Sequence, residues 1–82
     1  MYDFILTDKA KKQLNKFPSN LRNRIGIVFE RIKIRPYHFV KRKQGTPYYI
    51  LRIGEHRAIL DIKNNKLIIL VLEIGYRKDI YK

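Results

Sequence analysis

Residues 48–60 read YYILRIGEHRAIL, two runs of β-prone residues separated by a glycine and a glutamate. A two-residue connection that begins with glycine is typical of a type II′ hairpin turn, because glycine readily adopts the positive φ of the first turn position. The stretch therefore predicts a hairpin of two strands, residues 48–53 and 56–62, and the rest of the fold is arranged around it.

The register of this hairpin places two arginines opposite each other. With a two-residue turn, Ile53 faces His56 and Arg52 faces Arg57. Like charges at opposed positions destabilise a strand pair, whereas two converging guanidinium groups form a good site for a phosphate or a carboxylate. We interpret the pair as a candidate anion site. The arginine surface also carries Ile50 and Ile59, and the opposite surface carries Tyr49, Leu51, Ala58 and Leu60.

Three simpler arrangements of the two arginines remain open at this point. The long side chains could splay into solvent, or a bulge beside the turn could shift the register and separate them. Each arginine could also pair with an acid, for which the candidates are Glu55, Asp61 and Glu73. Each arrangement would leave no anion site between the strands.

The residues before the hairpin predict one strand and two helices. Residues 2–7 are β-prone, and Thr7 is a suitable N-cap for a helix over residues 8–17. The apolar residues of this helix are spaced four and three apart, as on one helical face. Ser19 is expected to cap a second helix that ends before Pro36, because the residue preceding a proline disfavours helical backbone. The two helices should form an αα-hairpin.

The residues after the hairpin predict one more strand, over 66–74, which follows an expected type I′ turn at Asn64-Asn65. This strand is apolar on both faces, so we expect it to be central in the sheet. The element order is βααβββ, which predicts an α+β fold. A four-stranded, antiparallel-dominated sheet would pack against an N-terminal helical hairpin. At this length, residues 1–82 are expected to form a single domain.

The chain is strongly basic, with 19 Lys and Arg against 7 Asp and Glu and a net charge of +12 over 82 residues. This charge favours nucleic acid as the partner, then an acidic protein, then an anionic membrane surface, while a merely soluble basic surface is the simpler alternative. Residues 31–54 contain seven basic residues and no acidic one. Aromatic rings that suit RNA stacking are interleaved there: Tyr37, Phe39, Tyr48 and Tyr49. We nevertheless expect Phe39 to anchor this segment to the core.

Several classes of chemistry lack their residues in this chain. There is no cysteine, which excludes a disulfide scaffold and a thiolate site and fits a reducing, cytoplasmic location. No metal-ligand cluster or phosphate-binding glycine loop is present, so neither a metal nor a cofactor is expected. No signal peptide or membrane-spanning run is recognised. His38 and His56 are interpreted as structural. Any catalysis would therefore depend on arginine, lysine and tyrosine, which can neutralise phosphate charge.

The chain resembles the RelE/ParE superfamily of toxins from prokaryotic toxin–antitoxin modules, in particular its RelE-like members. The likeness covers essentially the whole chain and rests on four segments: the aliphatic first strand, the helical break FPSNLRNRI at 17–25, the hairpin at 48–60 and the ending LEIGYRKDIYK at 72–82. The strongest motifs are the hairpin and the run from Tyr76 to Tyr81. It implies a type II toxin that enters the ribosomal A site and cuts the messenger-RNA codon there. In such endoribonucleases the ribose 2′-OH attacks the adjacent phosphodiester.

The resemblance also implies a role for individual residues. Arg57 would stabilise the phosphate in the transition state, and Arg52 and Arg77 would lie in the same site. Tyr81 would stack on or orient the attacked nucleotide. Four further basic residues are expected to bind RNA: Lys41, Arg42, Lys43 and Lys78.

The sequence departs from this family pattern at Ile50, where many active members carry lysine or arginine, and at Tyr76, where close relatives often carry histidine. Two alternatives therefore stay open: a ParE-like gyrase inhibitor, which lacks the nuclease site, and a catalytically weak member that acts mainly in its antitoxin complex. The implied partners are the ribosome, messenger RNA and a cognate acidic, RelB-like antitoxin, with which the toxin would form a hetero-oligomer.

Overall fold

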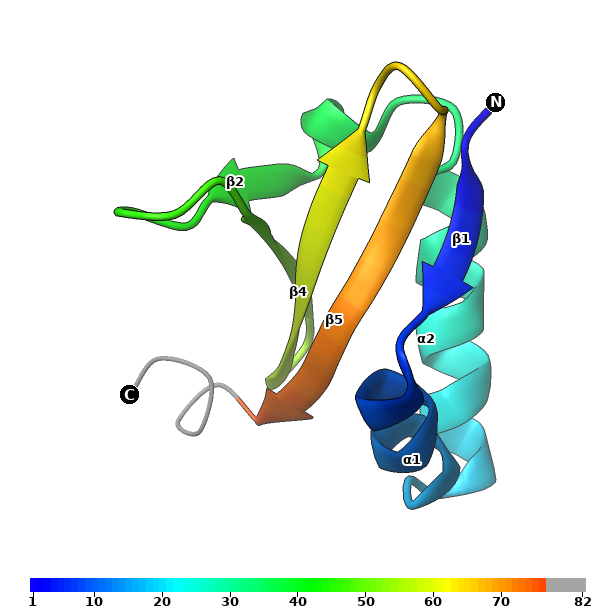
Figure 1. Ribbon diagram of the computed structural model, residues 1–82. Coiled ribbons are helices and arrows are strands. Elements are labelled where there is room, and N and C mark those ends of the chain that lie inside the picture. Colours follow the sequence, from blue (N-terminus) through cyan, green and yellow to red (C-terminus); the bar gives the residue numbers. More distant parts are fainter. Residues whose placement is uncertain (77–82) are drawn as a thin grey trace.

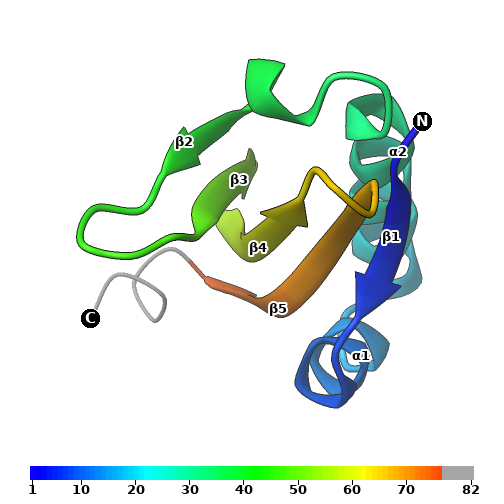
Figure 2. The ribbon, with the colours of Figure 1, turned by 45° about the horizontal axis from the view of Figure 1, so that its top comes forward.

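The computed structural model describes residues 1–76, which form two α-helices packed on one face of a five-stranded sheet. Figures 1 and 2 show this arrangement of the helices and the sheet. The strand order is β1-β5-β4-β3-β2. Strand β1 runs parallel to β5, and the other neighbouring strands are antiparallel. The elements are β1 (Asp3–Leu6), α1 (Asp8–Asn15), α2 (Ser19–Ile32), a 3-10 helix (Pro36–His38), β2 (Val40–Arg42), β3 (Tyr49–Ile53), β4 (His56–Lys63) and β5 (Ile68–Tyr76).

The predicted α+β class is confirmed, but the prediction of four strands was wrong. The additional strand, β2, lies in the basic connection before the hairpin and pairs with the outer edge of β3. It has only three residues and no apolar alternation, so its own sequence carries no strand signal. Its pairing partner holds it in place, and the backbone N–H of Lys43 donates to the carbonyl of Tyr48 at 2.9 Å.

The main core lies between the helices and the sheet. The rings of Phe4 on β1 and Phe29 on α2 stack with centroids 4.6 Å apart. Helix α2 buries Ile25 and Ile32 completely, at the 3.6-residue spacing that the sequence predicts. The sheet contributes apolar side chains that are almost fully buried: Leu51, Ile53, Ala58, Leu60, Ile69, Val71 and Ile74.

Helix α1 covers the part of β5 that β1 does not reach. The N-cap is confirmed, because the Thr7 hydroxyl oxygen accepts a hydrogen bond from the Ala10 N–H at 3.1 Å. Beyond the end of β1, the backbone N–H of Ile74 donates to Oε1 of Gln13 at 2.7 Å. A side chain thus satisfies a backbone donor of β5 that no strand pairs. Ser19 was wrongly expected to cap α2, since Pro18 occupies the cap position and no side-chain hydrogen bond is made there.

The turn between β3 and β4 was predicted correctly, whereas the turn between β4 and β5 was not. Gly54 adopts a φ of +59°, and the predicted hairpin register is present. The prediction of a type I′ turn at Asn64-Asn65 was wrong, because the residue with positive φ is Leu67 (+52°). Strand β5 consequently begins at Ile68. It also continues past Ile74 to Tyr76, since Arg57 and His56 of β4 provide pairing partners there.

Candidate functional site

The face of the sheet that points away from the helices carries the candidate site. It has a small apolar cluster of its own, in which Ile50 and Ile59 are buried and Tyr48 and Leu72 pack beside them. Leu72 reaches this cluster through a shift in the β4–β5 register next to Ile59. This cluster is separate from the main core, and we call the surface that bears it the open face.

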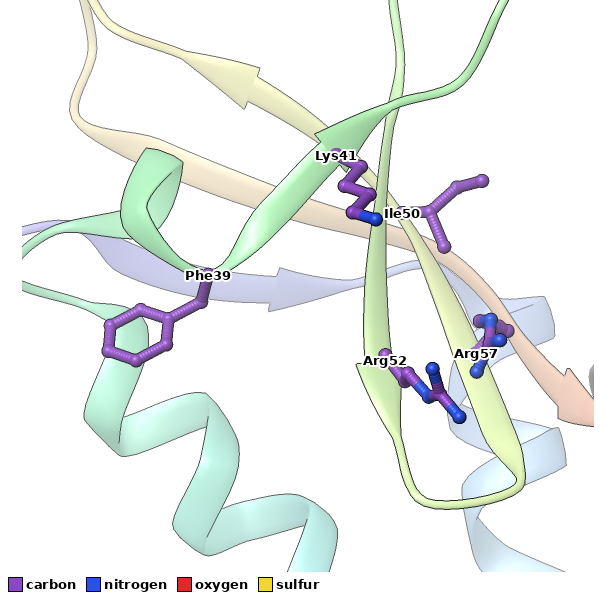
Figure 3. A pocket seen from close by; sticks show the side chains of 5 residues that line it. All are labelled: Phe39, Lys41, Ile50, Arg52 and Arg57. Carbon is purple, nitrogen blue, oxygen red and sulfur yellow. The ribbon is translucent and has the colours of Figure 1, made fainter.

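Arg52 and Arg57 are direct partners in the β3–β4 register, as the hairpin predicted. Figure 3 shows their side chains next to each other near the turn end of the hairpin. Arg52 is exposed, whereas only 5% of Arg57 is accessible to solvent. On its other side Arg57 faces Gly75 of β5, which adds no side chain. The geometry therefore combines one exposed cation at the surface with one buried cation in the sheet.

The alternatives for the arginine pair can be compared with this geometry. No bulge separates the two residues, because they pair directly. Two of the candidate acids have other partners: Glu73 pairs with Lys9 at 2.8 Å, and Asp61 pairs with Lys63 at 3.1 Å. Within residues 1–76, no carboxylate lies in salt-bridge distance of Arg52. An incoming anion would thus find Arg52 without competition from those acids.

A cavity of about 290 Å³ lies beside the arginines. The cavity is lined by the cations Arg52, Arg57 and Lys41 and by the apolar side chains of Ile50 and Phe39. Figure 3 shows Phe39 at the end farthest from the arginines. Phe39 is 42% exposed and does not anchor its segment to the core, so that expectation was wrong. A phosphate-sized anion at the arginines would have an aromatic ring in the same cavity.

The neighbouring basic residues Lys41 and Arg42 of β2 have different surroundings. Lys41 is the register partner of Ile50 and shares the open face with the arginines. Arg42 instead lies over the ring of Tyr49, with its guanidinium carbon 5.9 Å from the ring centroid, and its Nε donates to the carbonyl of Thr46 at 3.2 Å. A neighbouring hollow of about 310 Å³ is lined by Lys41, Arg42, Lys43, Gln44 and Ile50.

Three of the predicted site residues, Arg77, Lys78 and Tyr81, lie outside the described residues. The described chain ends at Tyr76, which pairs with His56 next to Arg57. The positions of these three residues relative to the cavity therefore remain predictions from the sequence.

The histidines and the hydrogen-bonded tyrosines lie outside the cavity. The ring centroid of His56 lies 5.2 Å from that of Phe17 and 4.5 Å from that of Tyr76. Neither His38 nor His56 lines the cavity. Partial burial raises the pKa of Tyr37, whose hydroxyl donates to Asn64 at 2.9 Å and ties the 3-10 helix to the β4–β5 turn. In residues 1–76 no three metal-ligating side chains gather. No helix of that region is long and apolar enough to cross a membrane.

Lys41 and Phe39 are the cavity residues whose position sequence reasoning missed. Lys41 was grouped with its neighbours as a general RNA contact, because a loop carries no information about which side chains share a face. Recognition of β2 as a strand would have separated Lys41 from Arg42, since successive side chains of a strand point to opposite faces.

The structure combines a helical hairpin on one face of a five-stranded sheet with a cavity lined by two arginines and a lysine on the other face. The family model described as the ParE toxin of the type II toxin–antitoxin system parDE matches residues 4–81. The chain therefore belongs to this toxin family, within the RelE/ParE superfamily. No curated protein sequence matches the chain.

Solved structures of RelE toxins share the fold. The RelBE2 toxin–antitoxin complex from Mycobacterium tuberculosis contains a chain that is 20% identical, with a TM-score of 0.82 over 93% of this chain and 98% of that one. The intact RelBE complex of E. coli gives a TM-score of 0.79 at 20% identity over 93% and 96% of the two chains. The RelE–RelB complex of the archaeon Pyrococcus horikoshii gives 0.80 at 22% identity over 93% and 94%.

Proposed function

We propose that this toxin is a ribosome-dependent endoribonuclease whose open face binds the scissile phosphodiester of messenger RNA. The observation that carries the proposal is the pairing of Arg52 with Arg57 in a cavity that Lys41 also lines. Opposed arginines are unfavourable in a strand pair without an anion. A phosphodiester reverses that penalty, because guanidinium groups bind its oxygens through charge-assisted hydrogen bonds.

The proposed reaction is an internal transesterification. The ribose 2′-oxygen forms a bond to phosphorus and the bond from phosphorus to the 5′-oxygen breaks. The 2′-hydroxyl proton passes to water, and the leaving oxygen receives one from water. Negative charge accumulates on the phosphate oxygens in the transition state. Fixed cations in a partly buried site stabilise this charge, and loss of one such donor typically slows the reaction about 100-fold to 1000-fold.

The two arginines have different parts in this proposal because their burial differs. Arg57, 5% exposed, lies in a site of lower effective dielectric and stabilises the developing charge most strongly. Arg52 is exposed and captures the phosphate first. Phe39 has enough exposed ring to stack on a base. By resemblance alone, Arg77 adds a further cation, Tyr81 orients the nucleotide and Lys78 contacts RNA.

The proposed partners follow from the charge and from the family. A net charge of +12 suits both ribosomal RNA and an acidic antitoxin. Arg42 and Lys43, at the β2 end of the sheet, would contact ribosomal phosphates. The similar toxins named above were crystallised with RelB antitoxins. We propose that a RelB-like antitoxin forms a hetero-oligomer with this chain in the cytoplasm and neutralises the same basic surface.

Inhibition of gyrase is the second candidate function, and the match to the ParE toxin model is the observation that favours it. A binding-only inhibitor needs no phosphate site on the open face. It would act on purified gyrase without a ribosome and would leave RNA intact.

One experiment with two parallel assays separates the two functions. Purified toxin is added to ribosomes translating a defined message, and primer extension maps the 5′ ends; the same preparation is added to gyrase in a supercoiling assay. We expect cuts at the A-site codon and unchanged supercoiling. Intact message together with reduced supercoiling would support the gyrase candidate and refute the nuclease.

A further inference from the structure

Lys41 occupies a special place among the basic residues of the β2 region. Its register partner on β3 is Ile50, which lies two residues from Arg52 and on the same face. Lys41 also lines the cavity that contains both arginines, whereas Arg42 and Lys43 do not. Figure 3 shows the Lys41 side chain directed along the open face toward Ile50.

We propose that Lys41 is the third cation of the arginine cavity and binds the same phosphodiester as Arg52 and Arg57. The inference rests on the proposed function and deepens it, because it moves Lys41 from a general contact with ribosomal RNA into the cleavage site. Within the described chain, Lys41 forms no ion pair that would hold it elsewhere. Its ammonium group is therefore available to a phosphate.

The neighbourhood of Lys41 suits this role. Ile50 is 8% exposed and belongs to the apolar cluster of the open face, so it supports the methylene stem while the ammonium group extends over it. Neighbouring strands are about 4.8 Å apart, and the flexible four-carbon stem of lysine spans more than one such step. The charge that β3 lacks at position 50 is thus supplied from β2.

The neighbours of Lys41 provide matched controls. Arg42 is already engaged by the Tyr49 ring and the Thr46 carbonyl. Lys43 has the same side chain as Lys41 and directly follows β2, but it lines the neighbouring hollow and not the arginine cavity. A site that depends on the arginine cavity should distinguish Lys41 from Lys43, and a diffuse electrostatic surface should not.

The first test measures binding without cleavage. Affinity for a fluorescein-labelled 2′-O-methyl RNA hexamer, which has no attacking hydroxyl, is measured for Lys41→Met, Arg52→Thr and the double variant. If both cations hold one phosphate, the double variant loses at least about threefold less affinity than the product of the single losses. For Lys43→Met combined with Arg52→Thr, the loss of affinity in the double variant should equal the product of the two single losses. Multiplicative losses in both cycles would overturn the proposal.

The second test measures cleavage of ribosome-bound message in a single turnover at saturating toxin. We expect Lys41→Met to cleave about 10-fold to 100-fold more slowly than wild type, and Lys66→Met, which changes an exposed lysine of the β4–β5 turn, to stay within about threefold of wild type. The exchanged variant, Lys41→Ile with Ile50→Lys, returns an ammonium group from the opposed position and should regain most of the rate. Failure of this variant to recover while its thermal transition matches wild type would overturn the proposal.

The two tests also separate this inference from the proposed function. Coupled binding without any cleavage by wild type would support the Lys41 site and refute the endoribonuclease. Cleavage by wild type with uncoupled binding, and with equal rates for Lys41→Met and Lys66→Met, would refute the Lys41 site alone.

Discussion

Replacement of Arg52 by threonine is predicted to stabilise the toxin while it removes part of the proposed phosphate site. Arg52 and Arg57 are direct partners, so their Cβ atoms lie roughly 5 Å apart. Two guanidinium charges held at a similar separation repel by about 0.8 kcal/mol in a medium as polar as water. Because Arg52 is exposed while Arg57 is buried, this high-dielectric value is the lower limit of the repulsion, and threonine suits a strand.

Salt decides how much of this repulsion is measurable. With a Debye length of about 10 Å at 0.1 M salt and about 3 Å at 1 M, the repulsion falls to roughly 0.5 and roughly 0.15 kcal/mol. For a domain of this size, 0.5 kcal/mol raises Tm by about 2–4 °C. Thermal unfolding followed by circular dichroism at pH 7, in a buffer without multivalent anions, should therefore show a gain at 0.1 M salt that largely disappears at 1 M.

Lys41→Thr is the matched control for this measurement. It removes one positive charge from the same face, but its register partner is the apolar Ile50. We expect a gain of less than half that of Arg52→Thr. A lower Tm for Arg52→Thr, or an equal gain for the two variants, would refute the argument that the opposed arginines form a strained anion site.

Three further predictions concern the stability of the fold. Leu67→Asn should raise the free energy of unfolding by about 0.5–1 kcal/mol in urea titrations, because asparagine tolerates the positive φ of +52°; a loss would contradict this. Gln13→Leu should cost about 1–3 kcal/mol, since it removes the acceptor of the Ile74 N–H; unchanged stability would contradict it. Leu60→Ala should lower the free energy of unfolding by about 2–5 kcal/mol in the same titration, because Leu60 is buried in the core. Ile27→Ala, on the exposed side of α2, should lower it by less than about 0.5 kcal/mol. Equal losses would show that the core is misplaced.

The hairpin could be predicted from the sequence because a local feature fixes it. A two-residue turn with glycine first permits one register, and that register determines every pair from Tyr49–Leu60 to Ile53–His56. The face of each side chain follows from strand alternation. The opposition of Arg52 and Arg57 was therefore readable from 13 residues.

The features that were missed depend on contacts between distant segments. Strand β2 is too short to show a pattern, and pairing with β3 is what makes it a strand. The β4–β5 turn was wrong because the left-handed residue is a leucine, for which local propensity gives no signal. The cavity could not be predicted either, since it combines Phe39 and Lys41 of the β2 region with residues of the hairpin.

The most direct test of the central claim is the rate at which Arg57→Gln cleaves ribosome-bound message, compared with wild type in a single turnover. Glutamine keeps much of the side-chain volume, and the thermal transition of the variant confirms that it is folded. We predict a rate about 100-fold lower than that of wild type, because the buried guanidinium group stabilises charge that develops only in the transition state. Equal rates for a folded Arg57→Gln and wild type would contradict the claim that the opposed arginines form the cleavage site.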